Sequence, residues 1–326
     1  MTVIRSQLIG TGYKLPAKVL TNDDLSKMVE TSDEWISTRT GIRSRHIAAA
    51  DELTSDLSYE AALMAIKNAG ISNQEIDFVI VATVTPDNTF PATAAKLAKK
   101  LELNPGTPAM DVNAACSGFV YASQIADNMI RLGQVKTALV IGAETLSKIT
   151  DWTDRNTCVL FGDGAGAVIL RAAECAGDTS DTGILATKIY ADGSQYDHLC
   201  SDSGVSCNQK AGFIHMDGKE VFKIAIPSLV QGVEESLKIA GVGLTDVDWY
   251  VPHQANLRII DSVAQKLGID KDKVIVTVDH HGNTSAASIP LALAESFEAG
   301  KFKKGDLIAV SAMGAGFTWG GMVIRI

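Results

Sequence analysis

Short apolar runs alternate with amphipathic segments along most of the chain. The runs FVIVATV (78–84), TALVIGA (137–143) and LIAVSA (307–312) have the length and composition of buried strands. After residue 117 the pattern changes, because apolar or small residues recur with the spacing of one helical face: Phe119, Ala122, Ile125, Ala126, Met129 and Ile130. Strands that alternate with helices indicate βαβ crossovers. The pattern therefore predicts an α/β protein with mixed, mostly parallel sheets.

A weak internal repeat divides this pattern in two. Residues 66–80 (IKNAGISNQEIDFVI) align without a gap to residues 237–251 (LKIAGVGLTDVDWYV), an offset of 171 positions. Each copy resembles a helix end closed by glycine, followed by an acidic turn and a strand. The segment 172–181 between the copies is small and polar. We predict two similar α/β halves packed together, residues 1–175 and 176–326.

Three polar residues fall at informative points of the pattern. Cys116 and Asn283 each follow a predicted strand and open a predicted helix, so the duplication places them at equivalent positions. His253 ends the strand VDWYVPH, in the same half as Asn283. Ligands of α/β sheets usually bind beyond the carboxyl ends of strands. We therefore expect the three side chains to face one cavity between the halves.

The thiol of Cys116 is the strongest candidate for chemistry. A cysteine at a helix N-terminus lies beside unpaired N–H groups at the positive end of the macrodipole, which favours its thiolate. The small neighbours Ala114, Ala115, Ser117 and Gly118 leave room for a substrate. The alternative is a buried cysteine that acts as a small hydrophobic residue.

The other candidates also have structural alternatives. Asn283 could be a helix N-cap, and a lone histidine such as His253 is more often structural than catalytic. The glycine-rich runs 162–166 and 314–316 lack the ending and spacing of nucleotide-binding loops. Small residues in these runs let the backbone approach other groups closely, so that a backbone N–H can point at a reacting oxygen. The adjacent histidines 280–281 could orient the Asn283 turn, and we assign them no chemical role.

Composition narrows the classes of function. The chain has 326 residues, of which 46% are hydrophobic and 21% charged, and its net charge is −9 at pH 7. With a pI near 5.2, nucleic acid is not an expected partner. The apolar runs are too short to cross a bilayer, and the N-terminal residues lack the apolar region of a signal peptide. We expect a cytoplasmic protein that does not bind membranes.

Cysteine usage points to a reducing environment. Five cysteines are an odd number and show no metal-ligand spacing with histidine, so neither a disulfide framework nor a metal site is expected. Cys200 and Cys207 lie in the polar loop 199–213. Exposed reduced thiols are favoured there over a loop disulfide.

Several motifs together carry a family resemblance. They are TSDEWISTRTGIRSRHI, DVNAACSGF, FGDGAGA, VPHQANLRII, HGNTSAAS and GFTWG, and they span both halves in order. The chain resembles the 3-oxoacyl-(acyl carrier protein) synthase III family, the initiating condensing enzymes of type II fatty-acid synthesis. The resemblance implies a thiolase-like fold with αβαβα layers and a Cys116–His253–Asn283 triad. It also implies condensation of a short-chain acyl-CoA, acetyl-CoA above all, with malonyl-acyl carrier protein through an acyl-Cys116 intermediate.

The same resemblance implies further site residues, a homodimer, and neither a metal nor a resident cofactor. The oxyanion would be held by the backbone N–H groups of Cys116 and Ala315. The residues implied for CoA are Trp35, Arg39, Arg155 and Asn256. Those implied for the acyl pocket are Leu146, Phe161, Ile214 and Met216, with Phe90 reaching the pocket of the partner subunit. We expect the loop 199–213 near this pocket. Those implied for the carrier protein are Lys223, Gln254, Ala255, Asn256, Leu257, Arg258 and Lys266.

Two alternatives remain at this point. One is a relative on the same scaffold that makes a secondary metabolite from a different acyl donor. The other is a degenerate member that binds acyl groups or carriers without condensing them. Elongating condensing enzymes resemble this fold but have histidine where Asn283 stands, and biosynthetic thiolases carry a second cysteine in the C-terminal glycine-rich turn. The chain has no cysteine after Cys207, so both differences favour the initiating synthase.

Overall fold

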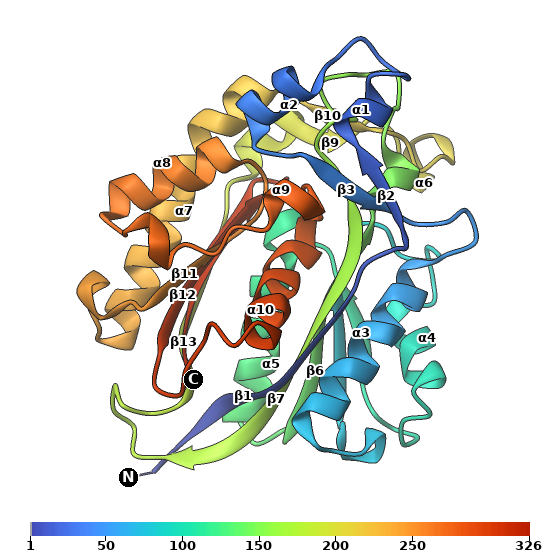
Figure 1. Cartoon of the computed structure of the whole chain (residues 1–326). Coiled ribbons are helices and arrows are strands. Elements are labelled where there is room, and N and C mark those ends of the chain that lie inside the picture. Colours follow the sequence, from blue (N-terminus) through green and yellow to red (C-terminus); the bar gives the residue numbers. More distant parts are fainter. Residues whose placement is uncertain (1) are drawn as a thin grey trace.

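The computed structural model describes residues 2–326, in which two large sheets and three layers of helices stack as αβαβα (Figure 1). The first sheet has the order β1-β7-β6-β4-β5. Its strands are β1 (Val3–Lys14), β7 (Asp163–Cys175), β6 (Thr137–Thr145), β4 (Phe78–Ala82) and β5 (Ala109–Val112). The second sheet has the order β11-β12-β13-β8. Its strands are β11 (Trp249–Pro252), β12 (Leu307–Gly314), β13 (Thr318–Arg325) and β8 (Gly183–Ala191).

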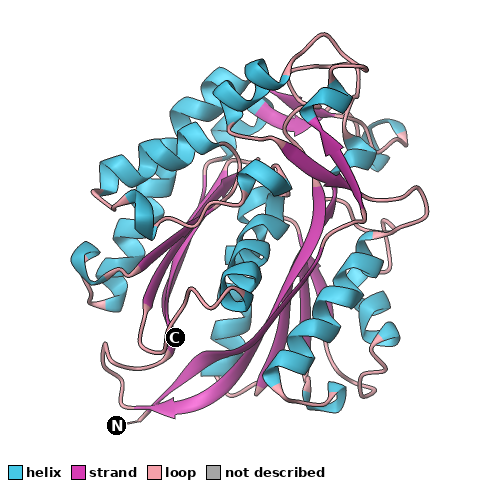
Figure 2. Cartoon of the chain, viewed as in Figure 1, coloured by secondary structure: helices cyan, strands magenta, loops and turns pink. Residues whose placement is uncertain are grey.

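The long helices cover both sheets (Figure 2). α3 (Thr54–Ala69) and α4 (Thr93–Lys100) pack on the outer face of the first sheet, and α7 (Gly218–Ala240) and α8 (Leu257–Leu267) on that of the second. α5 (Gly118–Arg131) and α10 (Ser288–Glu298) lie between the sheets in a core that draws residues from both halves. Within residues 2–326, no helix combines the length and apolar character needed to cross a bilayer.

The remaining elements are short and gather mainly at one end of the layers (Figure 1). Two small hairpins pair β2 with β3 and β9 with β10. These elements are β2 (Lys18–Thr21), α1 (Asn22–Leu25), α2 (Asp33–Thr40), β3 (Ser44–Ile47), β9 (Leu199–Ser201), α6 (Val205–Asn208), β10 (Ile214–Met216) and α9 (Val278–His281). The 3-10 turns are η1 (Asn73–Glu75), η2 (Ala115–Ser117), η3 (Leu146–Ile149), η4 (Gly193–His198), η5 (Leu244–Asp246), η6 (Lys271–Lys273) and η7 (Ser285–Ala287).

The sheets are mixed, as predicted, but the prediction that they are mostly parallel is wrong. Of the seven strand pairs in the two large sheets, three are parallel and four antiparallel. The reason lies in the connections: β7 follows β6, and β13 follows β12, without a crossover helix, so each strand reverses beside its predecessor. β1 and β8 then pair antiparallel with β7 and β13.

The internal duplication is visible in the strand order. β1, β7, β6 and β4 of the first sheet correspond to β8, β13, β12 and β11 of the second. The aligned segments also match, because α3 and α7 end at glycines in the left-handed conformation, Gly70 and Gly241, and η1 and η5 follow. The loop 176–182 connects β7 to β8. A division between residues 175 and 176 falls at the start of this loop and stays a prediction.

The predicted equivalence of Cys116 and Asn283 is wrong by three positions. The turn η2 leads into α5 at Gly118, and η7 leads into α10 at Ser288. Both turns begin at a residue other than glycine with positive φ, Ala115 at 45° and Ser285 at 47°. Cys116 therefore corresponds to Ala286. Asn283 follows the short helix α9 rather than a strand, a difference that the spacing of apolar residues does not encode.

Candidate active site

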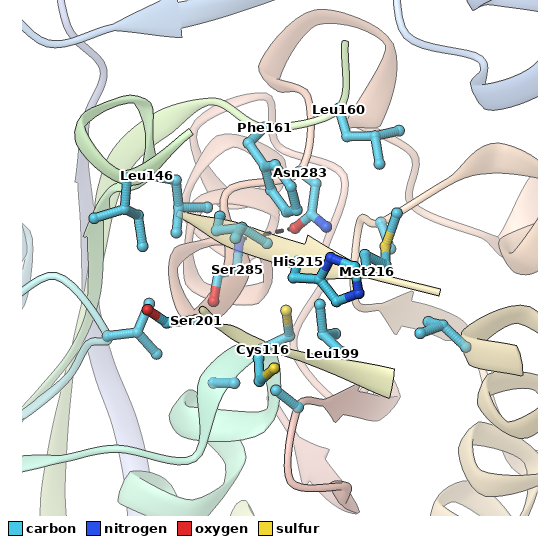
Figure 3. A pocket seen from close by; sticks show the side chains of 18 of the residues that line it. Cys116, Leu146, Leu160, Phe161, Leu199, Ser201, His215, Met216, Asn283 and Ser285 are labelled. Atoms are coloured by element: carbon cyan, nitrogen blue, oxygen red, sulfur yellow. Dashed lines mark hydrogen bonds between the residues drawn. The ribbon is translucent and has the colours of Figure 1, made fainter. Parts of the chain in front are cut away.

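A cavity of about 1860 Å³ opens at the junction of the two halves, and Cys116, His253 and Asn283 all line it. Figure 3 shows Cys116 and Asn283 directed into the same space, surrounded by apolar side chains from η3, β9 and β10. The predicted convergence of these three residues is therefore confirmed. It arises because η2, the end of β11 and the turn before η7 meet at this junction.

The backbone around Cys116 is fixed by contacts from both halves. The Ser117 hydroxyl donates to the Ala114 carbonyl at 2.7 Å, and the Thr318 hydroxyl donates to the same oxygen at 3.0 Å. Gly314 approaches so closely that a Cβ there would lie 2.5 Å from the Cys116 nitrogen. Ala315, the next residue, lines the cavity together with Cys116. The glycine-rich turn thus brings two backbone segments together, as its composition predicted.

The electrostatic state of the thiol differs from the prediction of a favoured thiolate. Burial raises the pKa of Cys116 to about 12, and the nearby Glu144 carboxylate also acts to raise it. The Ser285 hydroxyl acts in the opposite direction. Desolvation of the sulfur is the largest of these effects, and it favours the neutral thiol at neutral pH.

His253 is held in one position and one protonation state. Its backbone N–H donates to the Ser311 carbonyl at 2.8 Å, and its Nδ1 lies 2.7 Å from the Ser288 hydroxyl. That hydroxyl oxygen also accepts from the Gln254 N–H at 3.3 Å. When the hydroxyl donates its own hydrogen to Nδ1, the ring proton is on Nε2, the nitrogen that is free to donate to a ligand. Burial lowers the pKa of His253 to about 4, so the ring is neutral at neutral pH.

Asn283 is anchored by a short bridge to the segment before β7. Its N–H donates to the Leu160 carbonyl at 2.8 Å, and its carbonyl accepts from the Gly162 N–H at 3.0 Å. Its side-chain oxygen accepts from the Ser285 N–H at 2.9 Å, the dashed line in Figure 3. Since this bond occupies the amide oxygen, the NH₂ group is the part of the side chain left to donate into the cavity.

One residue predicted to contact the carrier protein lies in the interior instead. Gln254 is fully buried, and its side-chain NH₂ donates to the carbonyls of Pro252 and Ile275. Its side-chain oxygen accepts from the N–H groups of Thr277 and Val278. This amide joins the end of β11 to residues 275–278. Because the side chain is buried in these contacts, the prediction that it contacts the carrier protein is wrong.

Four of the other residues predicted for the carrier protein line the cavity. Lys223 on α7 and Arg258 on α8 are exposed and line it, as do Ala255 and Asn256. Arg258 places its guanidinium 5.8 Å from the ring centre of Phe222, next to Lys223. Leu257 packs against Gly41, and Lys266 is exposed in the last turn of α8. Two of the three predicted cations thus meet at the opening.

The residues predicted for CoA form a compact group beside the same opening. The guanidinium groups of Arg39 and Arg155 lie 4.6 and 4.7 Å from the ring centre of Trp35. The side chain of Asn256 donates to the Arg39 carbonyl at 3.2 Å. Arg155 rests directly against Trp35, so a flat base can stack between them only after the Arg155 side chain moves.

Of the five residues predicted for the acyl pocket, four line the cavity and Phe90 does not. Leu146, Phe161, Ile214 and Met216 line the same cavity as Cys116, and Figure 3 shows Leu146, Phe161 and Met216 around it. Phe90 does not line it and is 83% exposed, so any role in a pocket requires a second subunit. The loop 199–213 lies beside this pocket as expected, with Cys200 on the cavity wall. All five cysteines are free, and all lie among the described residues 2–326.

The neighbouring histidines interact with acidic side chains rather than with the cavity. His280 contacts Asp279 at 2.9 Å and Glu295 at 3.2 Å, and these carboxylates raise its pKa to about 9. His281 is buried and lies 3.4 Å from the same glutamate. One side-chain atom each of His280, His281 and Glu295 lies within 4.8 Å of the other two. The protonated state of His280 accounts for their contacts as an ion pair that joins α9 to α10.

Sequence reasoning missed two residues that hydrogen-bond to the predicted triad and one carboxylate that acts on it through its charge. Ser285 and Ser288 belong to the motif HGNTSAAS, in which nothing distinguishes them from ordinary helix-capping serines. Ser285 bonds Asn283 two residues away, and Ser288 bonds His253 across 35 residues of the chain. Glu144 lies near the end of β6, and the sequence does not indicate that folding brings this carboxylate near Cys116.

Comparison with known proteins agrees with this geometry. Two family models match: 3-oxoacyl-[acyl-carrier-protein (ACP)] synthase III over residues 110–193, and its C-terminal model over residues 237–326. Over 322 residues the chain is 57% identical to beta-ketoacyl-[acyl-carrier-protein] synthase III of Rhodospirillum centenum, with 99% of each chain covered. This chain belongs to the 3-oxoacyl-[acyl-carrier-protein] synthase III family.

Solved structures agree with the assignment to the synthase III family. The chain is 49% identical to the 3-oxoacyl-[acyl-carrier-protein] synthase III of Aquifex aeolicus, with a TM-score of 0.91 and 98% and 100% of the two chains covered. The priming beta-ketosynthase of the R1128 polyketide pathway is 33% identical, with a TM-score of 0.91 and coverages of 98% and 96%. The thiolase-like fold and the condensing acyltransferase activity implied by the motifs are thus confirmed.

Proposed function

We propose that this synthase III condenses a short-chain acyl-CoA, acetyl-CoA above all, with malonyl-acyl carrier protein to start a fatty-acid chain. The observation that carries the proposal is the single cavity lined by Cys116, His253 and Asn283, with a neutral imidazole and an amide NH₂ available as donors. The proposed product class comes from the names of the relatives. The proposed chemistry comes from the cavity, which Cys116 lines as a candidate nucleophile together with two neutral donors.

The first half-reaction is acyl transfer to Cys116. The sulfur attacks the thioester carbonyl, CoA leaves, and an acyl-enzyme remains. The tetrahedral oxyanion would accept from the backbone N–H groups of Cys116 and Ala315, which the Gly314 approach brings to one wall. Trp35, Arg39, Arg155 and Asn256 beside the opening would hold the CoA nucleotide, the cationic groups by stacking and charge.

The second half-reaction is decarboxylation and condensation. Loss of carbon dioxide from the malonyl group leaves an enolate, whose oxygen needs hydrogen-bond donors without a transferable proton of low pKa. His253 Nε2–H and the Asn283 NH₂ group supply them, because the Nδ1 contact and the amide-oxygen contact fix both orientations. The carbanion then attacks acyl-Cys116. No resident metal or cofactor takes part in this proposal.

The partners and the compartment follow from the same proposal. Lys223 and Arg258 at the cavity mouth would meet an acidic carrier protein, and Phe90 would complete the acyl pocket of a second subunit in a homodimer. Acyl-CoA and carrier-bound malonate would be met in the cytoplasm. The similarity to the R1128 priming ketosynthase supports a second candidate function, the priming of a polyketide with a different acyl donor.

Labelled acetyl-CoA tests the first half-reaction. We expect the protein to acquire one label per chain, and Cys116→Ser to acquire none, because a hydroxyl at this position is a far weaker nucleophile. His253→Ala and Asn283→Ala should still take up the label. Their decarboxylation of malonyl-acyl carrier protein should fall roughly 10²-fold to 10³-fold with each donor lost.

Two results would contradict the proposal. An unlabelled wild-type protein would favour a binding role, and normal decarboxylation in both donor variants would remove the enolate role. Product analysis with straight and branched acyl-CoA donors separates fatty-acid initiation from polyketide priming, since a strong preference for a long or unusual donor would favour the second.

A further inference from the structure

Two hydroxyl groups join the backbone segments that carry the proposed oxyanion donors. Ser117 follows the nucleophile in η2, and Thr318 begins β13, 201 residues further along the chain. Their hydroxyl oxygens are 2.7 Å apart. Ser117 is fully buried, whereas Thr318 lines the cavity. Neither hydroxyl has a part in the reaction proposed above, although their contact links the two halves of the chain beside the thiol.

The Thr318 hydroxyl reaches one carbonyl on each segment. It lies 3.0 Å from the Ala114 oxygen, two residues before Cys116, and 3.1 Å from the Ala315 oxygen. The Ser117 hydroxyl lies 2.7 Å from the same Ala114 oxygen. Two hydroxyl hydrogens are thus shared among two carbonyls and the contact between the hydroxyls, so these groups form one cooperative network.

One residue separates each of these carbonyls from an N–H of the proposed oxyanion site. The φ and ψ of Ala115 lie between the Ala114 carbonyl and the Cys116 N–H, and those of Ala315 lie between its own N–H and carbonyl. Because peptide groups are planar, holding the carbonyl leaves only these two dihedral angles to place the N–H. Ala115 also has a φ of 45°, an unfavourable value for alanine that persists only where the surrounding structure holds it.

The two N–H groups are available to a ligand. Among residues 2–326, neither the Cys116 N–H nor the Ala315 N–H donates to a backbone carbonyl. Both residues line the cavity. Donors of this kind stabilise an oxyanion only where the protein holds them in place beforehand, and a displacement of about 1 Å can slow a reaction roughly 10²-fold. The spacing of the two segments therefore matters for the rate.

The backbone of Thr318 is fixed without its hydroxyl. Thr318 pairs with Gly314 of β12 and with Ala191 of β8. The preceding residue, Phe317, exchanges two backbone hydrogen bonds with Asp192, both at 2.8 Å. Loss of the hydroxyl should therefore release the two carbonyls and leave β13 where it is.

We propose that Thr318 and Ser117 are positioning residues whose hydroxyl groups hold the two N–H donors of the oxyanion site at their working distance. The proposal rests on the acyl-transfer function proposed above. It concerns the two tetrahedral steps, acyl transfer to the thiol and attack of the carbanion on the acyl-enzyme. Malonyl decarboxylation uses the other pair of donors, His253 and Asn283, and does not depend on this clamp.

Thr318→Val tests the clamp, because valine is close to threonine in shape and lacks the hydroxyl. In single-turnover transfer from labelled acetyl-CoA to the full-length protein, we expect the maximal rate to fall roughly 10-fold. The acetyl-CoA concentration at half-maximal rate and the rate of malonyl decarboxylation should stay unchanged. Thr318→Ser retains the hydroxyl and should restore the rate. Thr187→Val makes the same change in β8, opposite Met322 and outside the cavity lining, and should keep the wild-type rates.

Ser117→Ala removes the other hydroxyl and carries the test if Thr318→Val does not fold. We expect the same split, with slower acyl transfer and normal decarboxylation. Ser123→Ala is the matched control, because Ser123 is buried on α5 and its hydroxyl has no partner among residues 2–326. It should keep the wild-type rates.

Infrared spectroscopy of the acyl-enzyme reports on the oxyanion site directly. With acetyl-CoA labelled at the carbonyl carbon, the thioester carbonyl band should lie at a higher frequency in Thr318→Val than in the wild type. The reason is that misplaced N–H groups polarise the carbonyl less. An unshifted band would contradict the clamp.

The rates separate the clamp from a general structural defect. Wild-type acyl transfer in both Thr318→Val and Ser117→Ala would overturn the clamp, and so would an equal loss of acyl transfer and decarboxylation. Failure of Thr318→Ser to restore the rate would overturn it as well. If the wild-type protein takes up no label, the proposed function fails and the clamp with it. A defect confined to the variants concerns the clamp alone.

Discussion

At the residue scale, environment changes what the candidate side chains can do. Cys116 lies before a helix, which favours a thiolate, yet burial raises its pKa to about 12. His253 is made a neutral donor by the same burial. Residue identity and motif order were enough to predict Cys116, His253 and Asn283. They could not predict protonation states, because these depend on groups such as Glu144 and Ser288 that reach the site through folding.

Gln254 shows that a residue within a recognised motif can have a purely structural role. It lies within a motif that implies carrier contacts, but both ends of its amide bond backbone groups inside the protein. Its neighbours, the half-buried Asn256 and the exposed Arg258, do line the cavity. A sequence motif therefore mixes residues that meet a partner with residues that hold the motif in place, and burial distinguishes them.

Ser288 provides a prediction at this scale. Replacing it with alanine removes the hydroxyl that donates to His253 Nδ1, so the ring can turn and its proton can move to Nδ1. We expect Ser288→Ala to slow malonyl decarboxylation roughly 10-fold, less than loss of the donor itself, while acylation of Cys116 continues. Nitrogen-15 NMR should show an Nε2-protonated His253 in the wild type and a mixture in the variant. Ser288→Thr, which retains the hydroxyl, should restore the rate; an unchanged tautomer in Ser288→Ala would contradict this role.

At the element scale, close backbone contacts hold the site. The Gly142–Gly166 pair in the β6–β7 ladder lies against the start of α10, so the η7 turn sits directly on the sheet. The sequence predicted the elements and the repeat, because helix ends, glycine caps and strands leave local patterns. It did not predict strand direction or the three-residue register of the turns, since both depend on how separate elements pack.

Gly142 tests the contact between β6 and η7. A Cβ at this position would collide with the carbonyl of Ala286, which backbone packing prevents from moving freely. We expect Gly142→Ala to lower the free energy of unfolding by about 3 kcal/mol and to slow condensation, because η7 carries the Ser285 N–H that orients Asn283. Gly193→Ala is the control, because a Cβ at Gly193 would meet no atom within 4 Å. Equal melting temperatures for the two variants, measured by circular dichroism, would contradict the packing argument.

At the scale of the whole molecule, the two halves share their central layer. The core between the sheets includes Phe78 and Phe119 from the first half and Val251 and Ile289 from the second. The cavity is divided in the same way, since the thiol comes from one half and the donors from the other. The duplicated sequence predicted two halves, each of which has a core cluster of its own, but it could not show that the halves also share a central core and a cavity.

A shared core predicts one cooperative unfolding transition, although chains longer than about 150 residues often unfold in steps. Separating the halves would expose α5 and α10 together, so unfolding of one half should remove the support of the other. Two single-tryptophan variants can report on the halves separately, one retaining Trp152 and the other Trp249. We expect their fluorescence curves in urea to coincide in midpoint with each other and with circular dichroism. Separate midpoints for Trp152 and Trp249 would show that the halves are independent folding units that only assemble the cavity.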